Sequence, residues 1–251
     1  MYPKIFNFID SYTLCILVGA MIAFINVIIY LKKKNFNKRN VLDMLICGCF
    51  AIAFGLVFAI LFQNFYDFIA HPQGYKWSFK MTFFGGLIGG VIAYLVTYYI
   101  LNKKWNQDIK AILVVAPSAI TLAHAIGRLG CFLAGCCYGK ETNSIWGIYF
   151  PNIGLKVFPT QLYEMGFLLI LSAILLFLTY KFDFKYTFVI YLISYSIFRF
   201  LIEFLRGDDR GFSLFGLSPS QIISILLLIL SIPLFFFLRN KVFKDEKETN
   251  N

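Results

Sequence analysis

The sequence predicts an all-α, polytopic membrane protein with about seven transmembrane helices, and three observations support this fold class. Hydrophobic residues make up 59% of the 251 residues and charged residues 14%, whereas a soluble domain has about 25% charged residues. Seven apolar runs approach the roughly 20 residues that a helix needs to cross the hydrocarbon. Lysine and arginine cluster in the connections between these runs, as in membrane proteins with several spans.

The predicted spans follow one another through short connections. They lie near residues 12–31, 41–63, 81–101, 109–126, 161–180, 186–205 and 218–238. Pro117 and Ser118 interrupt the fourth span, which is already short and leads directly into a glycine-rich segment. The sequence contains no repeat, low-complexity tract or linker. We therefore expect residues 1–251 to form a single integral membrane domain.

The basic residues predict how the helices are oriented in the plasma membrane. Fourteen lysines and arginines fall in the connections on one side, and eight fall on the other side, counted with the N-terminus. The side with more basic residues is expected to be cytoplasmic. This places the N-terminus outside, the C-terminus in the cytoplasm, and residues 139–159 in a small outward-facing loop subdomain. The net charge of +10 then matches anionic membrane lipid at the inner leaflet, and we expect no nucleic acid as a partner.

Residues 127–139 combine four glycines and three cysteines with Arg128 between two apolar spans. We expect a loop in which glycine lets backbone N–H groups approach a ligand, and in which the guanidinium of Arg128 binds a phosphate group. The alternative is a helix contact lined by glycine, with Arg128 extending to the interface. The substrate-binding candidates in this segment are Gly127, Gly130, Cys131 and Gly139.

His124 lies inside a predicted span, where an ionisable side chain is costly and therefore indicates function. It stands one helical turn before Arg128 and about two turns before Cys131, so the three side chains share a face if the helix continues that far. The alternative is an imidazole that is simply hydrogen-bonded to a neighbouring helix. We expect His124 to be catalytic.

Arg199 lies inside the sixth predicted span, at a cost of about 2.5–3.5 kcal/mol on insertion scales. Tyr195 and Glu203 lie one turn before and one turn after it, and Glu203 is its nearest acidic partner in sequence. Together with Arg128, Arg199 predicts a phosphate clamp formed by arginines from two helices. A structural ion pair between Arg199 and Glu203 is the competing interpretation.

Small and polar residues at the outer ends of two spans are further candidates for substrate binding. Gly85 and Gly86 belong to paired glycines that favour close helix packing and could also admit a lipid. Gln161 stands with Tyr163 and Glu164 at the entrance of the fifth span, where polar groups meet water or serve a cavity, and of these three only Gln161 is a candidate for substrate binding.

The cysteines Cys131, Cys136 and Cys137 have the spacing C-x4-C-C. This spacing fits neither the C-x-x-C of thiol oxidoreductases nor the paired spacings of structural zinc sites. A disulfide is compatible with the oxidising outer side. From the sequence, no metal and no diffusible cofactor is required.

Residues 127–139 resemble the signature of the prolipoprotein diacylglyceryl transferase family, which runs Gly-Arg-x-Gly-Asn-Phe and ends, after an acidic residue, in glycine. Three further family blocks match in the same order, within residues 83–89, 159–164 and 195–203, and Tyr12 matches the family's first-helix tyrosine. The resemblance covers most of the chain. The matching residues of the signature are Gly127, Arg128, Gly130, Phe132 and Gly139.

Four positions depart from the family pattern. Phe84 stands where the family usually has a histidine before its paired glycines, and Phe158 stands where it often has a histidine before the Pro-x-Gln-Leu-Tyr-Glu block. Cys131 and Cys136 replace the asparagine and the acidic residue of the signature. The phosphate-binding part is thus kept, and the group usually proposed as the base is missing.

The resemblance implies transfer of a diacylglyceryl group from phosphatidylglycerol to the cysteine thiol of a secreted prolipoprotein at the outer face of the plasma membrane. Glycerol phosphate would be released, and no cofactor would take part. Arg128, Arg199 and Tyr195 would be catalytic, and His124 would accept the thiol proton in place of the missing histidine. The competing proton acceptors are Glu203, Cys131 and Cys136.

Two other functions stay open at this point. One is a lipid-headgroup-binding or lipid-moving membrane protein that kept the clamp and lost the chemistry. Loss of the family histidine favours it, and retention of Tyr12, Arg128, Arg199 and Glu203 disfavours it. The other is a transferase with a different acceptor. Tyr12 and Glu203 are the remaining substrate-binding candidates.

Overall fold

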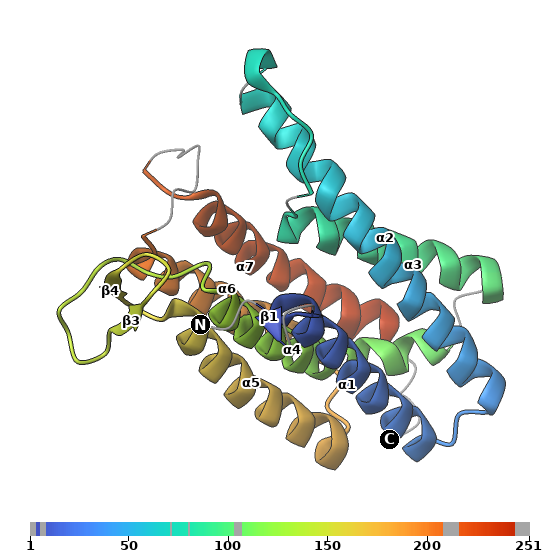
Figure 1. The fold of residues 1–251 in the computed structure, drawn as a ribbon. Helices are drawn as coiled ribbons and strands as arrows, with labels where there is room; N and C mark the ends of the chain where they lie inside the picture. The colour runs from blue at the N-terminus through green and yellow to red at the C-terminus, as the bar shows by residue number, and fades with distance from the viewer. Residues whose placement is uncertain are drawn as a thin grey trace. The chain divides into compact units, whose positions relative to one another are not determined.

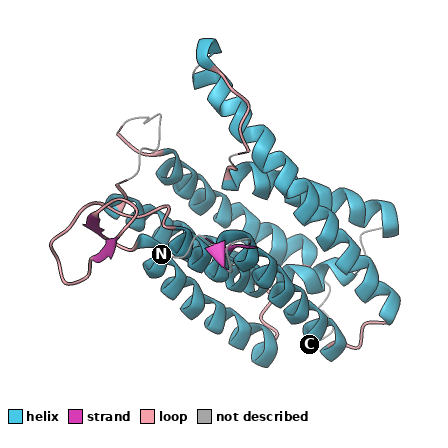
Figure 2. Cartoon of the chain, viewed as in Figure 1, coloured by secondary structure: helices cyan, strands magenta, loops and turns pink. Residues whose placement is uncertain are grey.

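The computed structural model describes residues 4–5, 9–70, 72–79, 81–102, 107–207 and 216–243. These residues are almost entirely helical, and the few strands are short (Figures 1 and 2). The helices are α1 (Ser11–Lys33), α2 (Lys38–Ala70), α3 (Phe83–Asn102), α4 (Gln107–Ala134), α5 (Thr160–Phe182), α6 (Thr187–Ile202) and α7 (Pro219–Phe237), joined by the short helices η1 (Pro72–Gly74), η2 (Glu203–Leu205) and η3 (Leu238–Val242).

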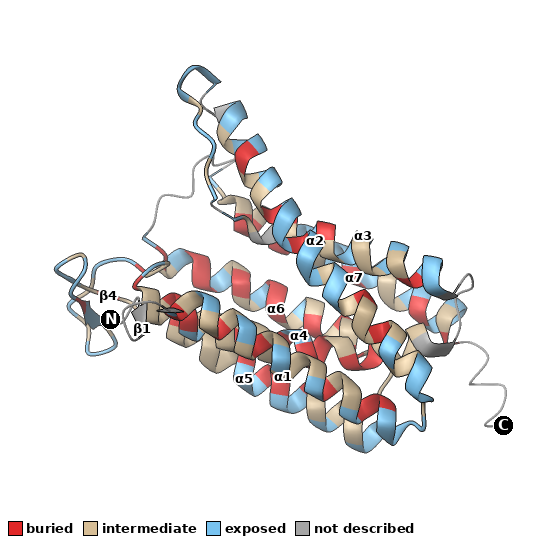
Figure 3. Cartoon of the chain, turned by 45° about the vertical axis from the view of Figure 1, so that its right-hand side comes forward, coloured by how far each residue is buried: buried red, intermediate tan, exposed pale blue. Residues whose placement is uncertain are grey.

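Six helices of the described ranges are long and apolar enough to cross a membrane, and α3 contains a shorter apolar stretch, Gly85–Leu101. Exposed apolar residues recur every four positions on α1, as expected for a helix with one face toward lipid. Figure 3 shows buried and exposed positions alternating along this helix. The predicted all-α, polytopic membrane fold is therefore confirmed. The exposed stripe on α1 consists of Leu17, Met21, Ile25 and Ile29.

The chain divides into two compact units, which are described separately. The larger unit comprises residues 1–30 and 110–251, and the smaller unit comprises residues 31–109. The larger unit holds most of α1 and α4 together with α5, α6 and α7, and the smaller unit holds α2 and α3. That residues 1–251 act as one domain stays a prediction.

Glycine allows α2 and α3 of the smaller unit to pack closely. A Cβ atom added at Gly85 would lie 2.5 Å from the Cβ of Phe62, and one added at Gly55 would lie 3.0 Å from the carbonyl oxygen of Gly86. No side chain larger than hydrogen fits at Gly85 without displacing α2. The connection between the helices is held by Asn64, which donates to the carbonyl of Ser78 over 2.7 Å and accepts from its N–H over 2.9 Å.

The core of the larger unit lies where α4, α5 and α6 meet. Ala125, Leu168, Leu171, Leu175, Tyr191 and Tyr195 form its buried cluster. Polar side chains link α1 to the same helices, because lipid offers no hydrogen-bond partner. Asn26 donates to Ser118 over 3.0 Å, and Tyr180 donates to the side chain of Asn26 over 2.7 Å. Helix α4 continues through Pro117, although Pro117 has no N–H to donate.

The expected loop over residues 127–139 is wrong in its first part, because α4 continues to Ala134. A glycine in a helix costs only about 1 kcal/mol, whereas an open backbone inside a membrane leaves several polar groups unsatisfied. Gly130 also brings α4 close to α1, since a Cβ there would lie 2.9 Å from the Cβ of Cys15. The backbone of Gly130 therefore belongs to the helix, and a substrate contact at Gly130 stays a prediction.

The helix ends in a Schellman motif. Gly135 adopts a φ of 71°, and its N–H donates to the carbonyl of Phe132 over 3.1 Å. The N–H of Cys136 donates to the carbonyl of Cys131, also over 3.1 Å. This pattern satisfies the last carbonyls of α4 and turns the chain sharply. The non-helical part of the predicted loop is thus only the short turn that begins at Gly135.

Residues 139–159 form a small connection with the antiparallel strands β3 (Ile148–Phe150) and β4 (Leu155–Val157). Gly139 pairs with Arg206 in a β-bridge, and the N–H of Lys140 donates to the carbonyl of Leu205 over 2.8 Å. The connection is therefore tied to the end of α6 through backbone hydrogen bonds. Two further short strands, β1 (Lys4–Ile5) and β2 (Ile9–Asp10), pair before α1.

Candidate functional site

Three side chains from two helices converge on one oxygen of Glu164, which is fully buried on α5. Arg128 Nη2 lies 2.9 Å from Glu164 Oε1, and the hydroxyl of Tyr195 donates to the same oxygen over 2.9 Å. His124 Nε2 lies 3.7 Å from it. A buried carboxylate is tolerated only when it is paired and hydrogen-bonded. This group of four residues, the Glu164 cluster, therefore depends on α4, α5 and α6 packing together.

The continuous α4 explains how His124 and Arg128 reach the same carboxylate. Residues four apart lie on one face of a helix, and α4 carries both toward α5. The ring of His124 meets the ring of Tyr195 edge-on, with centroids 5.3 Å apart. The predicted common face of His124 and Arg128 is confirmed, and Tyr195 is added to it from α6.

Arg199 forms a second ionic group on α6. Its Nη2 lies 2.8 Å from Glu203 Oε2 and donates to the hydroxyl of Ser220 over 3.1 Å. Ser220 belongs to the first turn of α7, which Ser218 and Gln221 cap reciprocally. The predicted pairing of Arg199 with Glu203 is confirmed. The charge of Arg199 also acts on Glu164 and His124, so both ionic groups face the same region.

The residues of this region keep hydrogen-bonding capacity that the described protein atoms do not use. The buried atoms without a partner there include Arg128 Nε, Arg199 Nη1, Glu164 Oε2 and Gln161 Oε1. Buried polar atoms in native proteins are normally satisfied by protein, water or ligand. Two guanidinium groups that each retain a buried N–H donor form the kind of surface that binds an anion.

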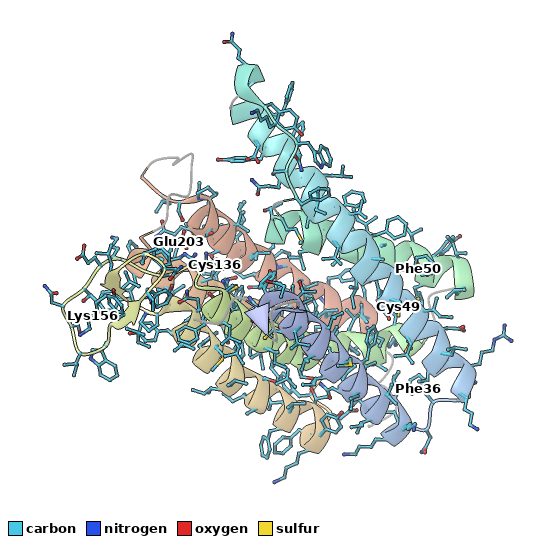
Figure 4. The ribbon with its side chains drawn as sticks, in the orientation of Figure 1. Phe36, Cys49, Phe50, Cys136, Lys156 and Glu203 are labelled. Atoms are coloured by element: carbon cyan, nitrogen blue, oxygen red, sulfur yellow. The ribbon has the colours of Figure 1, made fainter. Side chains whose placement is uncertain are left out.

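Side chains of α5 and of the 139–159 connection hold the turn after α4. Gln161 donates from Nε2 to the carbonyl of Cys136, and Thr160 donates to the carbonyl of Cys137 over 2.9 Å. Asn152 donates to the carbonyl of Gly135 over 2.9 Å. Figure 4 shows Cys136 at the end of the larger unit from which this connection leaves, with Glu203 at the same end. Gln161 therefore positions the turn through its amide nitrogen.

The three cysteines around this turn lie close together. The Sγ atoms of Cys131, Cys136 and Cys137 are all within 4.8 Å of one another, and all three thiols are free. Interaction with the neighbouring thiols of Cys131 and Cys136 lowers the pKa of Cys137 from its ordinary value, and the thiol of Cys136 also donates to the carbonyl of Cys131 over 3.6 Å. The structure therefore contains three free thiols at this turn and not the disulfide that the sequence left open.

The other predicted residues fall in different places. Tyr12 lies beside the site on α1, since a Cβ at Gly130 would be 3.2 Å from its Cα. Gly139 fits tightly, because a Cβ there would lie 2.6 Å from the carbonyl oxygen of Leu205. Gly127 has open space around its Cβ position. Substrate contacts of these three residues stay predictions.

Some predicted residues lie outside this region or outside the described residues. Gly85 and Gly86 belong to the smaller unit, where they contact α2, and their role in substrate binding stays a prediction. His71, the other histidine of the chain, and the side chain of Phe84 lie outside the described residues. The structure thus brings together the candidates on α1, α4, α5 and α6.

Sequence reasoning placed Glu164 at the entrance of a span but did not count it among the site residues. The sequence did contain a signal for Glu164, because a carboxylate next to an apolar run needs a partner. The partner, Arg128, is 36 residues away in sequence and on another helix. Arg206 was also missed, although it is 5% exposed and directly follows η2.

Comparison with known proteins gives matches over nearly the whole chain. The sequence model of the family described as prolipoprotein diacylglyceryl transferase matches residues 4–237. The phosphatidylglycerol–prolipoprotein diacylglyceryl transferase of Clostridium tetani is 32% identical over 245 residues, covering 94% of this chain and 97% of the relative. That of Finegoldia magna is 30% identical over 241 residues, covering 94% of each chain.

A third relative matches a shorter region more strongly. The phosphatidylglycerol–prolipoprotein diacylglyceryl transferase 2 of Clostridium perfringens is 46% identical over 155 residues, covering 59% of this chain and 58% of the relative. The two longer matches include both compact units, so the similarity is not confined to the ionic groups described above.

Proposed function

Because this chain belongs to the prolipoprotein diacylglyceryl transferase family, we propose that it transfers a diacylglyceryl group from phosphatidylglycerol to the cysteine thiol of a prolipoprotein. The relatives are transferases that carry the names of these two substrates. One structural observation carries the proposal for this chain. Arg128 and Arg199 each keep a buried N–H donor without a partner among the described atoms.

The two arginines would bind the phosphate of phosphatidylglycerol. Glu164 and Glu203 each occupy one Nη2 group, which fixes the guanidinium planes and leaves other donors for the phosphate oxygens. Negative charge grows on the departing phosphate as the carbon–oxygen bond breaks, and preoriented donors in a dry site stabilise such charge strongly. Guanidinium suits this task better than ammonium, because its planar fork matches phosphate.

The acceptor sulfur would attack the glyceryl carbon that carries the phosphate ester. The carbon–oxygen bond breaks, its electron pair goes to the phosphate oxygen, and glycerol phosphate leaves. His124 would accept the thiol proton, and Glu164, 3.7 Å from Nε2, would stabilise the imidazolium that forms. Tyr195 holds Glu164 and packs against His124, so it would position both groups.

The experiment that tests this function uses the full chain in lipid nanodiscs containing phosphatidylglycerol. A peptide with the lipid-acceptor cysteine should gain the mass of a diacylglyceryl group, and glycerol phosphate should appear in equal amount. The same peptide with serine in place of cysteine serves as control. Lipid binding without either product would favour a lipid-binding protein, and glycerol phosphate without peptide modification would indicate a different acceptor.

The proposed reaction requires that the site open to the outer face of the plasma membrane. The fourteen basic residues on one side and eight on the other support an N-terminus outside and a cytoplasmic C-terminus. Single cysteines replacing Asn143 and Lys34 in a cysteine-free chain should react with an impermeant maleimide from outside and only after permeabilisation, respectively. The reverse pattern would overturn this orientation.

A further inference from the structure

Three cysteine thiols lie close enough together at the end of α4 to bind one metal ion, although their spacing along the sequence matches no standard metal-binding motif. The Sγ atoms of Cys131, Cys136 and Cys137 lie within 4.8 Å of one another. Zinc binds thiolate sulfur at about 2.3 Å in a tetrahedron, which separates the sulfurs by about 3.8 Å. Small side-chain rotations that move the sulfur atoms by roughly an ångström would therefore bring all three to zinc-binding distance.

The backbone that carries these thiols is already held in place. Cys131 lies in the last turn of α4, and Cys136 is fixed to it by the hydrogen bonds of the Schellman motif. Cys137 has a φ of 64°, which few residues other than glycine adopt, and Thr160 binds its carbonyl. A turn that is held in an unusual conformation by neighbouring helices can orient ligands with little loss of entropy.

We propose that Cys131, Cys136 and Cys137 bind one zinc ion whose fourth position takes the acceptor thiol. This inference rests on the proposed function and identifies how its acceptor is activated. Among the described residues, no fourth histidine, cysteine or carboxylate joins the three thiols. Three protein ligands with an open position are typical of catalytic zinc. Cys131 is buried and Cys136 is exposed, so the open position can be reached from outside the helices.

The reaction is an alkylation of sulfur, and zinc supplies the reactive form of that sulfur. On binding zinc, the acceptor thiol would lose its proton to His124, because a coordinated thiol is deprotonated. The zinc-bound sulfur then donates an electron pair to the glyceryl carbon, the carbon–oxygen bond breaks, and glycerol phosphate leaves with that electron pair. The thioether product is a weaker ligand than a thiolate and dissociates from the zinc.

The charges around the cluster suit this arrangement. Three thiolates and one zinc ion carry a net charge of −1, and the bound acceptor thiolate would make it −2. The guanidinium groups of Arg206 and Arg128 both act on Cys137 and would offset this charge.

The first test measures bound zinc and does not depend on activity. Purified full-length protein, loaded with zinc and freed of excess metal, should retain one zinc ion per chain by elemental mass spectrometry. Cys136→Ser and Cys137→Ser should each lose at least about 10-fold in zinc affinity. Cys49→Ser, on the exposed surface of α2 (Figure 4), is the matched control and should retain the metal. Equal zinc content in all four proteins, or none in the unmodified chain, would overturn the site.

The second test asks whether the acceptor binds the metal. Cobalt replaces zinc in tetrahedral thiolate sites and gives absorption bands that report the number of sulfur ligands. Adding the acceptor peptide to the cobalt-loaded chain should intensify the sulfur-to-cobalt band, and the serine peptide should leave it unchanged. Identical spectra with both peptides would contradict acceptor binding at the fourth position. The test uses the unmodified sequence, so folding of cysteine variants does not enter.

The third test separates this inference from the proposed function. Removal of zinc by a chelator should slow transfer by at least about 100-fold, the lower range for losing a group that activates a nucleophile, and added zinc should restore it. Unchanged transfer by the zinc-free chain would overturn the zinc proposal and leave the transferase function standing. Binding of zinc and of the thiol peptide without any transfer would instead overturn the proposed function.

Discussion

The two arginines of the site are held in different ways. Arg199 pairs with Glu203, four residues later on the same stretch of chain, and with Ser220 at the start of α7. Arg128 pairs with Glu164 of another helix, and that carboxylate also binds Tyr195. The first group is largely local, whereas the second exists only when three helices have packed.

This difference predicts that the two arginines contribute differently to folding, although both are proposed to bind the phosphate. A local pair of residues four apart forms as soon as the helix forms. The Glu164 cluster links α4, α5 and α6, so its loss should destabilise the whole larger unit. Both arginines nevertheless keep a buried donor for an anion, and substitutions can separate the two properties.

The largest effect is expected for Arg128→Lys and Arg199→Lys. Each should reduce transfer from phosphatidylglycerol by about 100- to 1000-fold, because an ammonium group cannot replace the planar fork that stabilises the departing phosphate. Initial rates with a labelled cysteine peptide measure this, and Lys140→Ala in the exposed connection is the control. If both lysine variants turn over at the original rate, the arginines are structural and the clamp is wrong.

The next largest loss of transfer activity is expected for His124→Gln. The ion pair of Arg199 contains no histidine that corresponds to His124. Loss of the proton acceptor should slow transfer by about 100-fold, while phosphatidylglycerol binding and the thermal transition stay near their original values. His71→Ala should be mild. Full activity of His124→Gln would remove His124 from the chemistry and leave acceptor activation to the thiols.

Because Arg128 and Arg199 are held differently, removing the charge of Glu164 and removing that of Glu203 should lower the free energy of unfolding by different amounts. Glu164→Gln leaves the charge of Arg128 buried without its partner and should lower the free energy of unfolding by about 3–5 kcal/mol. Glu203→Gln should cost less, because Arg199 retains Ser220. Chemical unfolding in detergent compares the two variants.

Replacing both members of the Arg128–Glu164 pair sharpens this comparison. The double variant Arg128→Met with Glu164→Leu should be more stable than Glu164→Gln, since no buried charge remains. Glu141→Gln, on an exposed residue, serves as the control. Equal losses for Glu164→Gln and Glu203→Gln would show that the two groups contribute alike.

The smallest effects are expected at two glycines of α4. Gly130→Ala should destabilise the larger unit by about 1–3 kcal/mol, because the added Cβ would lie 2.9 Å from Cys15 of α1. Gly127→Ala meets no atom within 4 Å and should stabilise α4 by about 0.5–1 kcal/mol. Thermal unfolding of both variants in one detergent measures the contrast, and destabilisation by Gly127→Ala would contradict it.

Reading residues 127–139 as one loop was the main error of the sequence analysis. The glycines suggested an open backbone, but in a membrane the helix satisfies polar groups that a loop would leave exposed. Only the part from Gly135 onward leaves the helix, and there the positive φ of Gly135 requires it. The composition of residues 127–139 therefore identified the segment, whereas its largely helical conformation follows from the membrane environment.

Features that depend on neighbouring residues could be predicted from the sequence. Apolar runs of sufficient length specify membrane helices, because the hydrocarbon thickness sets the length that a span needs. The pairing of Arg199 with Glu203 follows from a spacing of four residues in a helix. Both features were predicted, and both are present in the structure.

Contacts between distant parts of the chain could not be predicted from the sequence, because they depend on how the helices pack. Nothing in local spacing connects Arg128 to Glu164, or brings Tyr195 to the same oxygen. The C-x4-C-C spacing likewise fits no paired zinc pattern, yet a helix end and a left-handed residue at Cys137 bring its three sulfurs together. Helix periodicity acts over a few residues, whereas these groups form because packing of separate helices satisfies buried charge and polar atoms that no single helix can satisfy alone.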